Sequence, residues 1–263
     1  MGYEFRLLGP LEIVRDGREV TPTAPKLCVV AALLVLRRNR LVQTSEFVDE
    51  LWGEDPPSSA IPTVHTYIYK LRKLLDGSGA GSADDLVHTC LNGYSARIPA
   101  EQVDVHRFEH LAEQGRTALM RGEAEHAARC CAGALRLWRG PALAGLPAGQ
   151  RLSAHVVRLG EALLRIRETR IEAELRLGHH REVVSELVEL TRAHTFHEGL
   201  ARQLMIALYR CGRRGEALAE YQRFRALMAD ELGLEPSPSL RRLQQSLLAG
   251  DPVPAALPAG EAS

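Results

Sequence analysis

Thr63-Val64-His65-Thr66-Tyr67-Ile68-Tyr69-Lys70-Leu71-Arg72-Lys73-Leu74-Leu75 is the stretch of sequence that decides the fold. Aliphatic residues recur along it and just before it at spacings of three and four, which is typical of an amphipathic helix with one buried face. They are Ile61, Val64, Ile68, Leu71 and Leu75. Pro62 falls in the first turn, where its missing N–H costs no hydrogen bond. The pattern predicts a helix from Pro57 to Leu75 with a buried aliphatic edge.

The opposite face of this helix is basic and contains Thr66, Tyr69, Lys70 and Lys73. No acidic residue occurs from Ser58 to Leu75, and the stretch holds two of the chain's three lysines. A helix about 10–12 Å across fits the major groove of B-DNA, where lysine can meet phosphates or guanine acceptors and a threonine methyl can contact thymine. Charge alone leaves open a solvated face on an ordinary helix. The elements around the helix favour DNA.

Those elements follow the order of a winged helix-turn-helix. Apolar and polar residues alternate in the first strands, and Asp16-Gly17 supplies a hairpin turn between strands. Two helices come next, and a second hairpin closes the region. We expect helices at Leu27–Arg38 and at Ser45–Trp52 (with Thr44 as its cap), a linker at Gly77–Ala83, and a hairpin from Leu86 to Arg97 around Asn92-Gly93.

The rest of the chain has a helical pattern. Gly178 and Gly212 are separated by the 34-residue period of the tetratricopeptide repeat, and Gly122 marks an earlier helix pair. The sequence therefore predicts an α+β winged-helix DNA-binding domain at residues 1–100 and an all-α, tetratricopeptide-like domain at residues 101–250. Residues 251–263 are proline-rich and predict a disordered tail.

Composition excludes several classes of protein. The chain has 263 residues and a formal net charge of zero, and its longest apolar stretch, Leu27–Leu36, is far shorter than the roughly 20 residues of a membrane-spanning helix. The first residues lack the pattern of a secretory signal, so we expect none, and five cysteines without a Cys-x-x-Cys pair fit reduced thiols in the cytoplasm. Motifs of nucleotide-binding, hydrolytic and zinc enzymes are absent, so we expect no enzyme, cofactor or metal.

Motif blocks in both halves of the chain resemble the Streptomyces antibiotic regulatory protein family. The first half carries Leu51-Trp52-Gly53, Pro56-Pro57, the Thr63–Leu75 stretch and Asn92-Gly93-Tyr94. The second half resembles that family's bacterial transcriptional activation domain in the segment Ala134–Leu143 and in Glu231–Leu243. The resemblance covers about residues 3 to 249.

The resemblance implies an activator that binds tandem direct repeats at promoters of antibiotic gene clusters, as a homodimer or as tandem protomers, and recruits RNA polymerase. It implies base contacts from Thr66, Tyr69 and Lys70, phosphate contacts from Arg72 and Lys73, and a backbone contact from Trp52. Thr63 and Ser58 complete the contacts expected around this helix. The loop of Glu54, Asp55, Pro56 and Pro57 corresponds to the segment that meets polymerase, with sigma factor as the expected partner.

The second hairpin departs from the family pattern. Relatives carry a basic residue near the position of Cys90, so His88 and Arg97 are the remaining candidates for a DNA contact there. Arg37, Arg38 and Arg40, between the first two helices, are expected to touch the DNA backbone. Two other functions stay open: a peptide-binding adaptor that works through the helical repeats, and a regulator that senses a small molecule. Cys90 is expected to be a plain small residue rather than an oxidation sensor.

Overall fold

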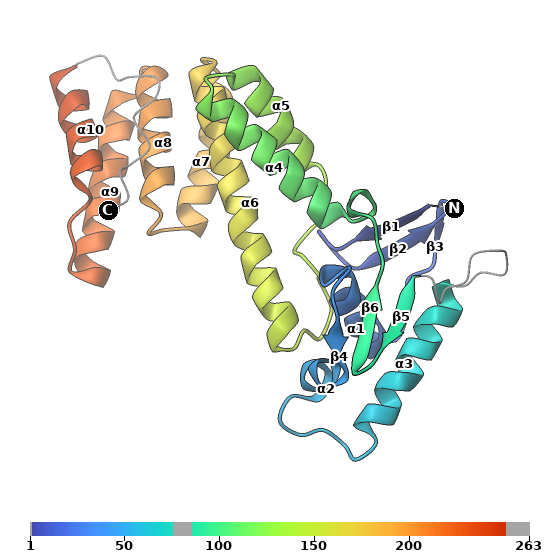
Figure 1. The fold of residues 1–263 in the computed structure, drawn as a ribbon. Helices are drawn as coiled ribbons and strands as arrows, with labels where there is room; N and C mark the ends of the chain where they lie inside the picture. The colour runs from blue at the N-terminus through green and yellow to red at the C-terminus, as the bar shows by residue number, and fades with distance from the viewer. Residues whose placement is uncertain (1, 76–85, 251–263) are drawn as a thin grey trace. The chain divides into compact units, whose positions relative to one another are not determined.

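The structure is a computed structural model that describes residues 2–75 and 86–250 (Figure 1). Its contacts divide the chain into two compact units, Met1–Ala112 with Gly133–Leu164, and Glu113–Ala132 with Arg165–Ser263. The helices α4 (Asp104–Met120), α5 (Ala124–Leu135) and α6 (Gln150–Arg176) contribute residues to both units. The expected linker Gly77–Ala83 and the expected tail lie outside the described residues. Domain boundaries at residues 100 and 250 stay a prediction.

The first unit opens with an antiparallel sheet of β1 (Tyr3–Arg6), β2 (Glu12–Arg15) and β3 (Arg18–Glu19). The turn between β2 and β3 has a positive φ at both Asp16 (47°) and Gly17 (80°), as a two-residue hairpin requires. This confirms the turn predicted from the sequence. Phe5 and Ile13 lie opposite each other on the buried face of the sheet.

Three helices follow, and Figure 1 shows them beside the second sheet of this unit. They are α1 (Pro25–Leu36), α2 (Thr44–Trp52) and α3 (Ala60–Leu75). The cap predicted for α2 is wrong by one residue: Gln43, not Thr44, is the N-cap and forms a capping box with Glu46. Gly53 ends α2 with a positive φ of 61° but a ψ of −126°, so it is not in the left-handed helical conformation.

The second sheet has the order β4-β6-β5, from β4 (Val42–Gln43), β5 (Val87–Cys90) and β6 (Gly93–Ala96). The hairpin is confirmed, but its turn is Leu91-Asn92 and Gly93 already belongs to β6. Glycine is needed at this position for a different reason, because a Cβ on Gly93 would lie 2.1 Å from the carbonyl oxygen of Val42. The short strand β4, which the sequence did not indicate, therefore packs directly on the hairpin.

Residues after position 100 complete the core of the first unit. The 3₁₀ helix η2 (Ala100–Gln102) leads into α4, whose first residue Asp104 accepts hydrogen bonds from the N–H groups of Leu7 and Leu8 at 2.8–2.9 Å. Burial raises the pKa of this carboxyl group, partly offset by those N–H donors. The segment after α5 pairs with the same loop, since the N–H of Leu143 donates to the Leu7 carbonyl at 3.0 Å.

The second unit is helical. Its later helices are α7 (His180–Ala193), α8 (Glu198–Arg210), α9 (Arg214–Leu232) and α10 (Pro238–Ala249). Neighbouring helices in this series pack side by side (Figure 1). Gly178 and Gly212 have φ values of 87° and 78° in the turns before α7 and α9, which confirms the helix pairs predicted from their spacing. None of the helices in the described parts of the chain is long and apolar enough to cross a bilayer.

Candidate nucleic-acid interface

Helix α3 separates a buried face from an exposed face as its sequence predicts. Val64, Ile68, Leu71 and Leu75 are all at most 3% exposed. Ile61 is the exception: it is 54% exposed, and Ala60 takes the buried position in the first turn. The prediction that Ile61 belongs to the core is therefore wrong.

The exposed face carries Thr66, Tyr69, Lys70 and Lys73, with Tyr69 65% exposed. Neither lysine forms an ion pair with any other described residue, so both ammonium groups face solvent. The Thr66 hydroxyl donates to the carbonyl of Pro62 at 3.0 Å, which uses its hydrogen and leaves its methyl group and the acceptor side of its oxygen available. This surface can offer two cations, one aromatic ring and one methyl group to a duplex. Thr63, half-buried, bonds in the same way to Ser59.

Arg72 points elsewhere. Its Nε and Nη2 donate to the carbonyl oxygen of Val87 at 3.0 and 2.7 Å, and Nη2 also donates to Thr89 Oγ1 at 2.8 Å. The guanidinium carbon lies 5.9 Å from the centre of the Tyr94 ring. The side chain expected at a phosphate therefore joins α3 to the hairpin of β5 and β6, which we call the wing. Its phosphate contact stays a prediction.

The tip of the wing carries no charged side chain. Cys90, Leu91 and Asn92 form it, and Leu91 is 98% exposed. The other two candidates in the hairpin differ in exposure, because His88 is half-buried on β5 whereas Arg97, just after β6, is exposed. Of these two side chains, Arg97 is the more accessible to DNA.

The arginines between α1 and α2 are mostly engaged within the protein. Arg38 Nη1 donates to the carbonyl of Ile98 at 3.1 Å, and Arg37 Nη2 lies 3.7 Å from Glu46 Oε1. Both are half-buried, whereas Arg40 is exposed. The structure thus leaves Arg40 as the most accessible of the three for a phosphate.

The loop after α2 is exposed throughout. Glu54, Asp55, Pro56, Pro57 and Ser58 all face solvent. Trp52, at the end of α2, is half-buried and has the Nζ of Lys26 4.6 Å from its ring centre. The position predicted to reach the DNA backbone therefore already has a cation above its ring.

Comparisons with known proteins match this arrangement along the whole described chain. Residues 17–95 match the family model described as transcriptional regulatory protein, C terminal, and residues 103–248 match that of the bacterial transcriptional activator domain. The regulatory protein DnrI of Streptomyces peucetius is 42% identical over 95% of this chain and 93% of its own length. The protein is a transcriptional activator of the Streptomyces antibiotic regulatory protein family.

Other relatives of this activator are longer. Regulatory protein AfsR of Streptomyces coelicolor is 43% identical over 98% of the chain, which spans 25% of AfsR. A solved structure of Mycobacterium tuberculosis EmbR, in complex with a low affinity phosphopeptide, superposes with a TM-score of 0.91 at 37% identity and covers 96% of this chain and 66% of that one. These relatives and both matching domains are those of transcriptional regulators, which form a non-enzymatic family.

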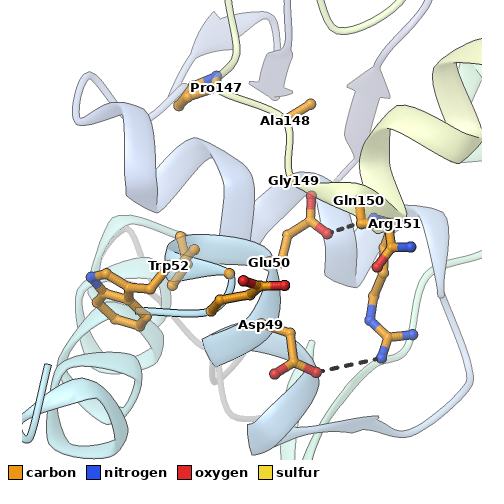
Figure 2. Close-up of a pocket in the computed structure, with 11 residues that line it drawn as sticks. Asp49, Glu50, Trp52, Pro147, Ala148, Gly149, Gln150 and Arg151 are labelled. Carbon is orange, nitrogen blue, oxygen red and sulfur yellow. Dashed lines mark hydrogen bonds and ion pairs between the residues drawn. The ribbon is translucent and has the colours of Figure 1, made fainter. Parts of the chain in front are cut away.

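One buried carboxylate of the activator was missed by the sequence reasoning. Glu50, on α2, is 5% exposed and accepts hydrogen bonds from the N–H groups of Arg151 at 2.9 Å and Leu152 at 3.2 Å, at the start of α6. Figure 2 shows it pointing at that backbone. A Cβ on Gly149 would lie 2.4 Å from the Glu50 carbonyl oxygen, so the two segments approach closely. No local signal in the sequence could reveal this contact, because Glu50 lies about a hundred residues before the N–H groups that it binds.

A cavity of about 520 Å³ lies between these two segments of the first unit. Its wall is formed by the end of α2 and by the residues before and at the start of α6, including Asp49, Trp52, Glu54, Pro147 and Arg151 (Figure 2). Arg151 pairs with Glu46 at 3.0 Å and approaches Asp49 at 3.8 Å. The cavity thus has a mixed lining, with apolar side chains beside three carboxylates and one arginine, and it lies beside the exposed loop after α2.

Proposed function

We propose that this activator binds tandem direct repeats in the promoters of a secondary-metabolite gene cluster, in the cytoplasm, and recruits RNA polymerase there. The exposed face of α3 carries the proposal. It presents Thr66, Tyr69, Lys70 and Lys73 on a stretch without an acidic residue, although the whole chain has as many acidic as basic residues. A protein of zero net charge can bind nucleic acid only through such a local concentration of positive charge.

The roles of these side chains follow from their chemistry. We assign base contacts to Thr66, Tyr69 and Lys70, through the threonine methyl, the ring and the ammonium group. We assign a phosphate contact to Lys73, one turn from Lys70 towards the end of the helix. Phosphate contacts position the protein and give the salt dependence, whereas base contacts give the preference for sequence.

One recognition helix reads only a few base pairs, so specific binding needs at least two protomers. Half-sites about 10–10.5 base pairs apart present the same groove face to each protomer. Direct repeats, which the family resemblance implies, require a head-to-tail contact between protomers instead of a two-fold one.

The acidic loop after α2 is the proposed contact with polymerase. Glu54, Asp55, Pro56 and Pro57 are all exposed, and no basic residue occurs between Thr44 and Ser58. This surface suits a basic segment of the polymerase, for which the family resemblance favours the sigma factor. Rim charges of this kind steer association and orientation.

Selection from a library of random duplexes with the full chain tests the DNA-binding proposal. The enriched duplexes should contain two copies of one short motif in the same orientation, about one helical turn apart. Failure to enrich any motif, or enrichment of an inverted repeat, would contradict it. Lys73→Gln should then weaken binding to every duplex alike and reduce the slope of log K against log salt by about one.

A polymerase gel shift on the selected duplex tests the second part. The double variant Glu54→Gln/Asp55→Asn should bind DNA normally but fail to form the complex that contains polymerase. Glu19→Gln, an equally exposed acidic residue on β3, is the matched control and should behave as wild type. Equal recruitment by the double variant and the control would remove the loop from the proposal.

A further inference from the structure

The guanidinium of Arg72 forms a hydrogen-bonded link between α3 and the wing. It spans from α3 to β5 with three hydrogen bonds of 2.7–3.0 Å to Val87 and Thr89. The acceptors are the main-chain oxygen of Val87 and the hydroxyl oxygen of Thr89, at opposite ends of a three-residue segment of β5. The planar fork of donors on a guanidinium fixes both the distance and the orientation of β5 relative to α3, which a single ammonium group cannot do.

The aromatic side chain beneath this guanidinium is itself held in place. Tyr94 packs edge-on against Phe47 at 6.2 Å and against His65 at 6.3 Å between ring centres. It therefore connects the wing to both α2 and α3. Arg72, above its ring, completes a contact that involves all three elements of the candidate interface.

The wing is also fixed at its other edge. Strand β6 lies between β5 and β4, and the close approach of Gly93 to Val42 leaves no room for a side chain. The N–H of Thr44, at the start of α2, donates to the carbonyl of Asn92 in the wing turn at 3.0 Å. The turn of the wing is thus held by backbone contacts to β4 and α2, while Arg72 joins strand β5 of the wing to α3.

We propose that Arg72 is a positioning residue that sets the wing at a fixed spacing from the base-reading face of α3. The proposal rests on the proposed DNA binding and differs from the phosphate contact that the sequence suggested. The uncharged tip that it positions, with Leu91 98% exposed, meets the duplex through apolar contact, which adds affinity without adding to the salt dependence.

Two substitutions at position 72 distinguish the roles. Arg72→Lys keeps the charge but loses the fork of donors, and Arg72→Gln loses both the charge and the fork. A positioning role predicts that both variants bind the selected duplex about tenfold more weakly, with an unchanged salt slope. It also predicts that hydroxyl-radical protection is lost under the wing but kept under α3. A phosphate contact predicts wild-type binding by Arg72→Lys, and a salt slope lowered by about one in Arg72→Gln, and would overturn the proposal.

Thr89→Val provides a second, milder variant, because it removes only the hydroxyl acceptor at nearly constant volume. It should weaken binding by about threefold in the wild-type background and have no further effect in Arg72→Gln. Full additivity of the two changes would also overturn the proposal. Lys73→Gln serves as the control for a true phosphate contact. If it too leaves the salt slope unchanged, the proposed DNA-binding face itself is at fault, which separates the two failures.

Discussion

Replacing Glu50 by glutamine is the substitution that most sharply tests how the DNA-binding half is held together. The side chains have nearly the same shape, so the change creates no cavity. Both carboxylate oxygens of Glu50 accept N–H groups at the start of α6, from Arg151 and Leu152. In the variant, one of those N–H groups faces the NH₂ end of the amide instead of an acceptor.

The cost can be worked from these two contacts. Leaving one buried N–H without an acceptor costs about 1–3 kcal/mol. Removing a negative charge from the N-terminus of a helix costs about 0.3–1 kcal/mol at exposed sites and up to about 2 kcal/mol at buried ones. Because Glu50 is only 5% exposed, we expect a total loss of about 2–5 kcal/mol. For a chain of this size that lowers the melting temperature by about 4–20 °C.

Thermal and urea unfolding of the full chain, followed by circular dichroism, measure this loss. Glu54→Gln makes the same chemical change four residues further along the chain, in the exposed loop after α2, and should cost less than about 0.5 kcal/mol. Equal stability of the two variants would refute the reasoning, since it would mean that the buried carboxylate contributes no more than a solvated one.

Three further predictions follow from the first unit. The fragment Met1–Ala100 lacks Asp104, which caps the loop after β1, and should show no cooperative melting transition; a sharp transition would establish it as autonomous. Burial and neighbouring arginines lower the pKa of His106 and of His155 below 6.5. The unfolded chain therefore takes up these protons more readily than the folded chain, so the stability of the folded state is highest above that pH and falls as the pH is lowered. A variant with both changed to glutamine should lose less stability between pH 7 and pH 5 than the wild type, and parallel profiles would argue against this. Gly93→Ala would place a methyl group 2.1 Å from a main-chain oxygen, so it should lower the free energy of unfolding by about 2–3 kcal/mol and weaken DNA binding. Wild-type stability and DNA affinity in this variant would disprove the prediction.

Local patterns were enough to predict which faces of α3 are buried and exposed. The spacing of Val64, Ile68 and Leu71 identified the buried face of α3, and the exposed face then followed from helical geometry alone. The turn at Asp16-Gly17 and the glycines between helices were predictable for the same reason, because a positive φ is a property of the local backbone.

Contacts between distant segments were not predictable. Arg72 looks like one more cation on a basic helix, and only the position of β5 shows that its donors are used within the protein. Gly93 was assigned to the turn because Asn-Gly is a strong turn signal, but strand β4, which is two residues long, requires glycine there instead. Glu50 was missed because its partners come from α6.

The most direct test of the central claim is to repeat the duplex selection with Lys70→Ala and compare its enriched motif with that of the wild type. If the exposed face of α3 reads bases, the variant's motif should keep its length and repeat spacing. It should lose its preference at one position in each half-site, at a cost of about 1–3 kcal/mol on the wild-type duplex. An unchanged motif, bound with unchanged affinity, would show that sequence is read by another surface.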